Sequence, residues 1–201
     1  MMTITYPVKN GIYVNMTNRC PCKCTFCLRY NADSVYGSDP LWLNREPTVE
    51  EVCESIDDWD LTKYDEVVFC GYGEPTERLD DLLKVAAHIR AKSNIKIRIN
   101  TNGLSDRIHG EKTAHKLAGL IDTVSVSLNA SNKEEYFKIV RPKFGIDSYD
   151  AMLSFTKDCT AYVPNVVMTI VDVVTSPEEQ ERCRRICESV GATLRIRAFE
   201  Q

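Results

Sequence analysis

Short β-rich runs alternate with helical patterns along the whole chain, and this alternation limits the folds open to it. The predicted strands span residues 11–17, 66–72, 96–102, 123–129, 165–173 and 193–199. Repeated βα units favour a parallel sheet covered by helices. Right-handed crossovers curl such a sheet toward a barrel. We therefore expect an α/β fold, a partial (β/α)6 TIM-like barrel with a parallel sheet and outer helices.

Helix-start signals occur between the predicted strands. Capping boxes, in which a Ser or Thr precedes a Glu by three residues, are found at Thr48-x-x-Glu51, Ser131-x-x-Glu134 and Ser176-x-x-Glu179. Pro177 fits the first position of the last helix, and Gly191 fits its end. An amphipathic pattern predicts a further helix over 78–93. Six units are fewer than the eight of a complete barrel, and no linker divides the chain, so we predict a single domain over residues 1–201.

Alternation within the strands gives each one an apolar face and a polar face. The polar positions are Tyr13, Asn15 and Thr17, then Arg98, Asn100 and Asn102, then Ser125, Ser127 and Asn129, and finally Arg195 and Arg197. Parallel sheets rarely leave a face bare. We therefore expect helices on the apolar face and a cavity lined by the polar face. An open sheet with one solvated face would give the same alternation.

Four of the nine cysteines lie in one run, NRCPCKCTFCLRY. Cys20, Cys24 and Cys27 form a C-x3-C-x2-C pattern, with Phe26 just before the last thiol. Three thiolates can bind three irons of a 4Fe–4S cluster, whereas a cluster that only carries electrons usually has four. The fourth iron would then be open, as in a catalytic metal site. Zinc on Cys24, Cys27 and the upstream thiols Cys20 or Cys22 is the alternative, although no second CxxC and no paired histidines complete a conventional zinc site.

The other cysteines and the overall charge exclude several classes of function. Cys53, Cys183 and Cys187 fall at helical spacing among apolar residues, which favours core packing. Nine cysteines without a secretion signal indicate a reducing compartment, so we expect a cytoplasmic protein. The net charge of −4, without a basic stripe, gives no support for nucleic-acid binding. No apolar run is long enough for a membrane span. No ligand spacing relates the histidines, which are His88, His109 and His115.

Three further motifs follow the ends of predicted strands, where barrel active sites form. They are Cys70-Gly71-Tyr72-Gly73-Glu74-Pro75-Thr76, Asn100-Thr101-Asn102-Gly103 and Ser127-Leu128-Asn129-Ala130. Glycine lets a backbone approach a ligand closely, and Glu74 can accept hydrogen bonds from an ammonium group. The alternative is that glycine and asparagine serve here only as turn formers.

Together, the segments NMTNRC…CTFC, VVFCGYGEPT, RINTNGL and VSVSLNA resemble the radical S-adenosylmethionine (SAM) superfamily, and most closely its small members associated with TatD-type nucleases. The resemblance implies a cluster on Cys20, Cys24 and Cys27 whose fourth iron chelates SAM. It implies reductive cleavage of SAM to a 5′-deoxyadenosyl radical that abstracts hydrogen from a substrate. The SAM-binding residues that it implies are Phe26, Gly71, Tyr72, Gly73, Glu74, Asn100, Asn102, Ser127 and Asn129.

The chain departs from the superfamily pattern in two places. Tyr72 replaces the first glycine of the GGE motif, which contacts the methionine amino group of SAM. The run VDVVTSPEE after the fifth strand lacks a G-x-I-x-G-x-x-E motif, so no adenine contacts are predicted. The resemblance also implies an electron donor such as flavodoxin or ferredoxin, and a functional link to a TatD-type nuclease.

The substrate is predicted from charge. Arg98, Arg195 and Arg197 fall on polar strand faces, and a buried charge without a partner is costly. The predicted partners are Glu74, Glu200, the SAM carboxylate or an anionic substrate, for which a planar guanidinium is well suited. We favour Arg197 over Arg195 because it lies nearer the carboxyl end of its strand. Two alternative functions stay open. One is a non-catalytic zinc or iron–sulfur module, and the other is a barrel hydrolase, for which no Ser/His/Asp or carboxylate constellation is found.

Overall fold

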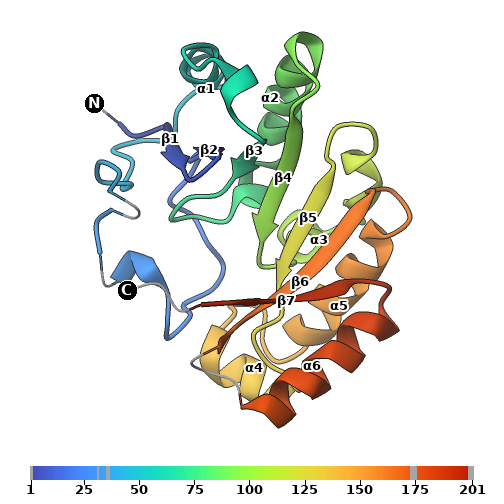
Figure 1. Ribbon diagram of the computed structural model, residues 1–201. Coiled ribbons are helices and arrows are strands. Elements are labelled where there is room, and N and C mark those ends of the chain that lie inside the picture. Colours follow the sequence, from blue (N-terminus) through green and yellow to red (C-terminus); the bar gives the residue numbers. More distant parts are fainter. Residues whose placement is uncertain (1, 31, 35–36, 173–175, 199–201) are drawn as a thin grey trace.

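The computed structural model describes residues 2–30, 32–34, 37–172 and 176–198, and Figure 1 shows its ribbon. One seven-stranded sheet runs in the order β1 to β7. The first two strands are antiparallel, and every later neighbour is parallel. The strands are β1 (Thr5–Val8), β2 (Gly11–Val14), β3 (Glu66–Phe69), β4 (Lys96–Thr101), β5 (Thr123–Ser127), β6 (Asn165–Val171) and β7 (Thr193–Arg197).

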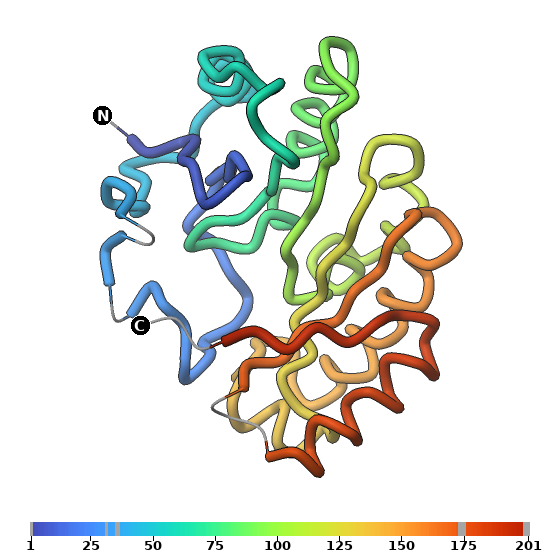
Figure 2. Tube along the Cα trace, in the orientation of Figure 1, coloured from blue at the N-terminus to red at the C-terminus, as the bar shows by residue number. Residues whose placement is uncertain are grey.

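The six predicted parallel strands are confirmed as β2 to β7, and the α/β class is confirmed with them. Strand β1 was not predicted. It forms a tight hairpin with β2, and the turn at Lys9 takes a positive φ of 52°. No pairing joins β1 to β7 in the described sheet, so the barrel is open between them. Figure 2 shows the curvature that this open barrel retains.

Helices cover the outer face of the curved sheet (Figure 1). The α-helices are α1 (Val49–Asp57), α2 (Leu79–Lys92), α3 (Ser105–His109), α4 (Lys133–Val140), α5 (Ser148–Cys159) and α6 (Pro177–Ser189). Short 3-10 helices span Leu28–Tyr30, Leu61–Lys63, Pro75–Arg78 and Ala114–Leu117. The helix predicted over 78–93 is confirmed as α2.

The core lies between the helices and the apolar face of the sheet. Ile97 and Val124 of the central strands are fully buried, and they share one cluster with Leu82 of α2 and Phe155 of α5. Burial of such side chains contributes about 1.5–3 kcal/mol each. The packing predicted for three of the five cysteines outside the motif run is confirmed. The thiols of α6, Cys183 and Cys187, are fully buried, and Cys53 of α1 packs partly buried against the same core.

Two of the three predicted capping boxes form differently from the prediction. Thr48 and Glu51 make the full box at α1. At α4 the cap is one residue later, on Asn132, whose Oδ1 accepts from Glu135 N at 2.9 Å. Ser131 instead donates its N–H and hydroxyl to the carboxylate of Glu179, at 2.7 and 2.9 Å. Ser176 still caps α6. The Glu179 side chain, however, binds Ser131 just before α4, because the N–H and hydroxyl of Ser131 give it two donors.

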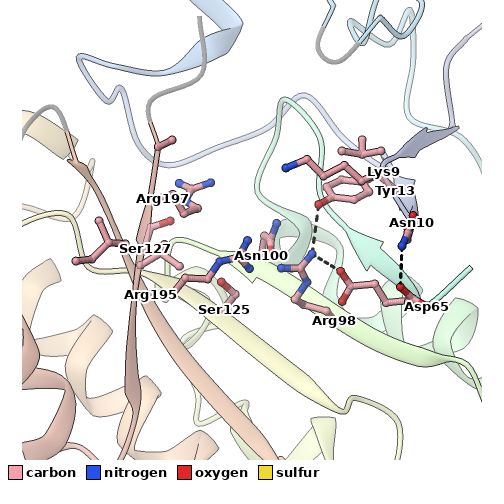
Figure 3. Close-up of a pocket in the computed structure, with 16 residues that line it drawn as sticks. Lys9, Asn10, Tyr13, Asp65, Arg98, Asn100, Ser125, Ser127, Arg195 and Arg197 are labelled. Atoms are coloured by element: carbon pink, nitrogen blue, oxygen red, sulfur yellow. Dashed lines mark hydrogen bonds and ion pairs between the residues drawn. The ribbon is translucent and has the colours of Figure 1, made fainter.

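The polar strand faces line a cavity inside the open barrel, as predicted. This inner cavity has a volume of about 670 Å³ and is lined by Tyr13, Arg98, Asn100, Ser125, Ser127, Thr169, Arg195 and Arg197, among others (Figure 3). Asn15 and Thr17 are not among the residues that line this cavity, because β2 ends at Val14. Their side chains bind the loop that follows, at Leu41 O (2.7 Å) and Glu46 Oε1 (2.5 Å).

Candidate cofactor and substrate site

A second pocket, of about 280 Å³, lies at the carboxyl ends of the central strands. We call it the cofactor pocket. It is lined by all four cysteines of the motif run, Cys20, Cys22, Cys24 and Cys27. The nine predicted SAM-binding residues line it too, namely Phe26, Gly71, Tyr72, Gly73, Glu74, Asn100, Asn102, Ser127 and Asn129. The fold therefore brings four separate sequence segments together around one space.

The cysteine loop follows β2 and is fixed by α4. Backbone hydrogen bonds run from Lys23 N to Val140 O (3.1 Å) and from Thr25 N to Ile139 O (2.9 Å). Asn102 Nδ2 lies 3.9 Å from Cys20 Sγ and 3.7 Å from Cys22 Sγ. The turn after β4 thus contacts the loop from the opposite side.

The thiols differ in acidity because their surroundings differ. A hydrogen bond from Cys22 lowers the pKa of the Cys20 thiol. Burial raises the pKa of Cys24 to about 12, and burial also raises the pKa of Cys27. Cys22 is the donor in the bond to Cys20, and that bond raises its own pKa.

The motif thiols do not form a ready-made site for a single metal ion in the described structure. Among the described residues, no three His, Cys, Asp or Glu side chains converge on a single-ion position. A tetrahedral zinc with bonds of about 2.3 Å would hold its thiolates at close mutual contact. Thiolates on a cluster stand farther apart because each binds a different iron. Cys20, Cys24 and Cys27 line one pocket without converging on one point.

Glu74 is a buried carboxylate that accepts four hydrogen bonds from protein donors. It accepts hydrogen bonds from Thr76 N (3.1 Å), Thr76 Oγ1 (2.7 Å), Thr101 Oγ1 (2.7 Å) and Asn102 N (2.7 Å). Burial nevertheless raises its pKa above the usual range. Oε1 takes three of these bonds and Oε2 takes one, and a carboxylate oxygen has two lone pairs. Oε2 therefore keeps one site for a further donor, such as the ammonium predicted from the sequence.

The two glycines of the motif are required by protein packing. A Cβ at Gly71 would lie 2.1 Å from Asn15 Oδ1, and one at Gly73 would lie 2.1 Å from Thr17 O. The exit of β2 therefore passes directly against the turn after β3. Tyr72 points its side chain away from this contact, where its hydroxyl donates to Ala32 O and its ring packs edge-on to Trp42. The replacement of glycine by Tyr72 thus adds an anchor for the loop after the cysteine run.

Several buried polar atoms in the cofactor pocket lack a protein partner. Among the described residues, these include Asn100 Oδ1, Asn129 Oδ1 and Tyr136 Oη. Asn129 is 4% exposed and adopts a positive φ of 64°. A buried acceptor without a partner costs about 1–3 kcal/mol. The pocket is thus suited to a polar ligand such as SAM that supplies the missing hydrogen bonds.

The inner cavity adjoins the cofactor pocket, and Tyr13, Asn100, Ser127 and Arg197 line both. Arg98 of the cavity is 8% exposed and pairs with Glu66 Oε1 at 2.6 Å, with Tyr13 Oη 3.2 Å away (Figure 3). Glu66 was not among the partners predicted for Arg98. Side chains alternate along a strand, so Glu66 and Val68 lie on the same face of β3. Val68 pairs with Arg98 on β4, and this alternation is the sequence signal that would have identified Glu66 as a partner of Arg98.

Arg195 and Arg197 differ from Arg98 because neither forms an ion pair within the described residues. Both are exposed on the edge strand β7, and both line the cavity in Figure 3. Ile196, between these two arginines, is 40% exposed and also lines the inner cavity. Glu200, a predicted partner, lies outside the described residues.

Sequence patterns missed several residues of the cofactor pocket, and four of them are Arg29, Cys70, Thr101 and Tyr136. Three of them stand inside the quoted motifs, so proximity in sequence was an available signal. Tyr136 comes from α4, and no local pattern connects it to the site. Two of the histidines make contacts away from the pocket, His88 with Asp57 and His109 with Thr76 O.

Comparison with known proteins identifies the family. The family profile described as Radical SAM superfamily matches residues 14–187, which is most of the chain. The chain belongs to the radical SAM superfamily. Members of this superfamily are enzymes that use a 4Fe–4S cluster and SAM. A search of curated proteins gave no match.

Solved structures share the fold of this radical SAM protein. Streptococcus suis SuiB bound to S-adenosylmethionine has 16% identity and a TM-score of 0.65, with 94% of this chain and 38% of that chain covered. A radical SAM methyltransferase from Sphaerobacter thermophilus has 18% identity and a TM-score of 0.62, with 96% and 57% covered. Methylornithine synthase (PylB) has 15% identity and a TM-score of 0.64, with 94% and 53% covered. The chain spans less than two thirds of each of these proteins.

No described helix of this radical SAM protein combines the length and apolar character needed to span a membrane.

Proposed function

We propose that Cys20, Cys24 and Cys27 hold the cluster and that SAM binds beside them, with the substrate in the inner cavity. The observation that carries this proposal is the shared lining of the two spaces. All the predicted cluster and SAM residues line the cofactor pocket, which shares Asn100, Ser127 and Arg197 with the cavity. When bound, the reduced cluster and SAM supply a 5′-deoxyadenosyl radical that abstracts hydrogen from a nearby substrate.

The side chains of the pocket bind and orient the ligands. Asn100 and Asn129 offer unpartnered acceptor oxygens to SAM. Glu74 holds the Asn102 backbone and keeps one lone pair for the SAM ammonium group. Tyr72 and Leu41 are nearly fully buried in the pocket wall, so they exclude water from the reacting atoms.

We further propose that the substrate is a small anion. Arg195 and Arg197 present two guanidinium groups to the cavity without an ion pair in the described structure, whereas Arg98 is neutralised by Glu66. Ser127, Thr169 and Arg195 are neighbours across β5, β6 and β7, because Ser127 pairs with Thr169 and Thr169 pairs with Arg195. The two hydroxyl groups therefore add hydrogen-bond donors beside Arg195. A carboxylate or phosphate matches such a set of donors. Arg197 also lines the cofactor pocket, so it lies nearest the chemistry.

Three finer assignments rest on the sequence. The motif segments resemble those of the radical SAM proteins associated with TatD-type nucleases, and this resemblance supports a functional link to such a nuclease. The cluster requires a one-electron donor such as flavodoxin or ferredoxin. The nine cysteines of the chain form no disulfide, which suits a reducing compartment, and we propose the cytoplasm.

The test of the catalytic proposal is anaerobic reconstitution with iron and sulfide, followed by reduction and addition of SAM. We expect 5′-deoxyadenosine to form slowly without substrate, measured by liquid chromatography and mass spectrometry. The triple variant Cys20→Ala/Cys24→Ala/Cys27→Ala should form none. Stoichiometric zinc without iron in anaerobically isolated protein would instead support the non-catalytic module.

The anionic substrate is tested by a metabolite screen. Carboxylates, phosphates and neutral compounds are compared for acceleration of deoxyadenosine release, first with the wild-type enzyme and then with Arg197→Met. Arg185→Met is the matched control, because Arg185 is exposed on α6 and pairs with Glu181. The proposal predicts acceleration by an anion that Arg197→Met abolishes and the control retains. Acceleration by a neutral compound would show it to be wrong.

A further inference from the structure

Positive charge is concentrated around the cysteine loop in a chain that is otherwise acidic. The whole chain has 29 acidic and 25 basic residues. The segments 19–30 and 136–146, the cysteine loop and the end of α4 with the turn after it, contain six basic residues and no acidic one. The rest of the protein therefore carries a larger negative charge than the total of −4 suggests.

The two segments form one structural unit. Besides the bonds from Lys23 and Thr25 to α4, Lys143 N donates to Pro21 O at 2.8 Å. Figure 1 shows α4 beside the start of the long loop that follows β2. Lys23 stands between Cys22 and Cys24 and is exposed, while its neighbours line the cofactor pocket. The outer side of this unit is therefore the protein surface, and its inner side is the proposed cluster site.

The basic side chains on the outer side of this unit lie at the protein surface. Lys23, Lys138, Arg141 and Lys143 are all exposed, and we call them the basic patch. Within the described residues, Lys23, Arg141 and Lys143 have no ion pair, and Lys138 has only a 3.6 Å contact with Glu135. The other two basic residues of the segments are committed elsewhere, Arg19 to Glu46 and Arg29 to Tyr30. Phe137, 42% exposed, adds an apolar surface beside the patch.

We propose that the basic patch is the docking surface for an acidic one-electron carrier protein, which reduces the cluster through the cysteine loop. This inference rests on the proposed function of Cys20, Cys24 and Cys27. Charge complementarity selects the partner, because opposite surface potentials raise association rates by about 10–1000-fold. Transient electron-transfer complexes bury little surface, which a patch of four residues with one apolar neighbour supplies.

The electron transfer forms and breaks no covalent bond. The anionic flavin hydroquinone of a reduced flavodoxin gives up one electron and becomes the neutral semiquinone. The cluster gains that electron, and no proton is transferred. The overall acidity of the chain outside the patch repels an acidic carrier from other faces, which restricts productive encounters to this one.

The experiment measures cluster reduction by stopped flow, with a reduced bacterial flavodoxin of low isoelectric point as the donor. In Arg141→Glu/Lys143→Glu, we expect the second-order rate constant to fall by about tenfold or more at low salt. The wild-type rate should fall steeply with ionic strength, and the variant's rate should not. The matched control is Arg184→Glu/Arg185→Glu, which makes the same charge change on exposed residues of α6 and should retain most of the rate.

A second reductant separates the docking surface from the cluster itself. Reduced methyl viologen is a small cation that needs no docking surface, so it should reduce the cluster of every variant at an undiminished rate. Equal iron content and an unchanged electron paramagnetic resonance signal would show that the variants fold around an intact cluster. Failure of all variants and of wild type to bind iron would contradict the proposed function instead.

Two results would overturn the docking proposal. The first is an unchanged flavodoxin rate in Arg141→Glu/Lys143→Glu, and if that variant also lost retention of an RNA oligonucleotide, the basic patch would be assigned to a nucleic acid. The second is an equal loss of rate in the α6 control.

Discussion

Glu74 Oε2 accepts a hydrogen bond from the backbone N–H of Asn102 at 2.7 Å, so the turn after β3 is fixed to the turn after β4. Asn102 in turn directs its amide toward Cys20 and Cys22. The three motifs of the cofactor pocket are thereby joined through protein contacts that exist before any ligand binds.

Removal of the Glu74 carboxylate should affect stability as well as SAM binding. In Glu74→Ala, the buried donors of Thr76, Thr101 and Asn102 lose their acceptor, at a cost of about 1–3 kcal/mol for each group left unpaired. Chemical denaturation should show this loss, and equilibrium dialysis should show weaker SAM binding. Glu50→Ala, at an exposed position of α1, is the control. Unchanged stability in Glu74→Ala would contradict the structural role of this carboxylate.

The cluster should depend on three of the four motif cysteines. Cys20→Ala, Cys24→Ala and Cys27→Ala should each lose the absorbance and iron content of the reconstituted protein. Cys22→Ala should keep a cluster, because Cys20, Cys24 and Cys27 supply the three thiolates of the predicted ligand set. If Cys22→Ala lost the cluster and Cys20→Ala kept it, the ligand assignment would be wrong.

Arg98 should prove structural, unlike the two arginines of β7. Arg98→Met leaves Glu66 without its 2.6 Å partner, and we expect a loss of about 1.5–3 kcal/mol in the free energy of unfolding. Arg98→Met/Glu66→Gln should recover part of it, because the unpaired charge is gone. Arg197→Met should change stability by less than about 0.5 kcal/mol, since Arg197 is exposed without an ion pair. Equal stability losses in the two single variants would refute the distinction.

Gly73 should tolerate no side chain. A methyl group at Gly73 would overlap the Thr17 carbonyl oxygen, 2.1 Å away, and the Arg19 carbonyl oxygen, 2.7 Å away. Because both neighbours are backbone atoms next to Cys20, we expect Gly73→Ala to lower the melting temperature and the cluster content together. Gly11→Ala is a matched control, with its nearest contacts at 3.4 and 3.5 Å. Wild-type cluster content in Gly73→Ala would show that the loop shifts freely.

Acid should destabilise the sheet through Asp122. Burial raises the pKa of this carboxyl, but the Ile97 N–H and the Arg90 guanidinium more than offset burial and lower the pKa below its ordinary value. A lowered folded-state pKa gives stability that is present above the unfolded value of about 3.9 and is lost as pH falls through the folded value. Asp122→Asn should reduce stability at pH 7 by about 1–3 kcal/mol. Denaturation curves from pH 7 to pH 3 should have a smaller slope with pH in Asp122→Asn than in wild type.

Local patterns predicted the elements that depend on local forces. The alternation of β4 and β5 predicted their two faces, and the Thr48 capping box was read from four residues. The same patterns placed the α4 cap on Ser131, one residue early, because Glu179 is 48 residues away in sequence and its carboxylate competes for Ser131. Strand β1 was missed because it contains Pro7, and a proline argues against a strand until the run is seen to pair with β2.

By itself, the sequence determined the parallel α/β order, the cysteine loop and the motifs at the strand ends, because periodicity and spacing are properties of neighbouring residues. Only the tertiary structure decided how those motifs are used. Glu66 neutralises Arg98 across two strands, Glu74 fastens Asn102, and β7 stands at an open edge with Arg195 and Arg197 unpaired in the described structure. These outcomes depend on side chains distant in the chain that compete for the same few partners, and folding alone brings them within reach.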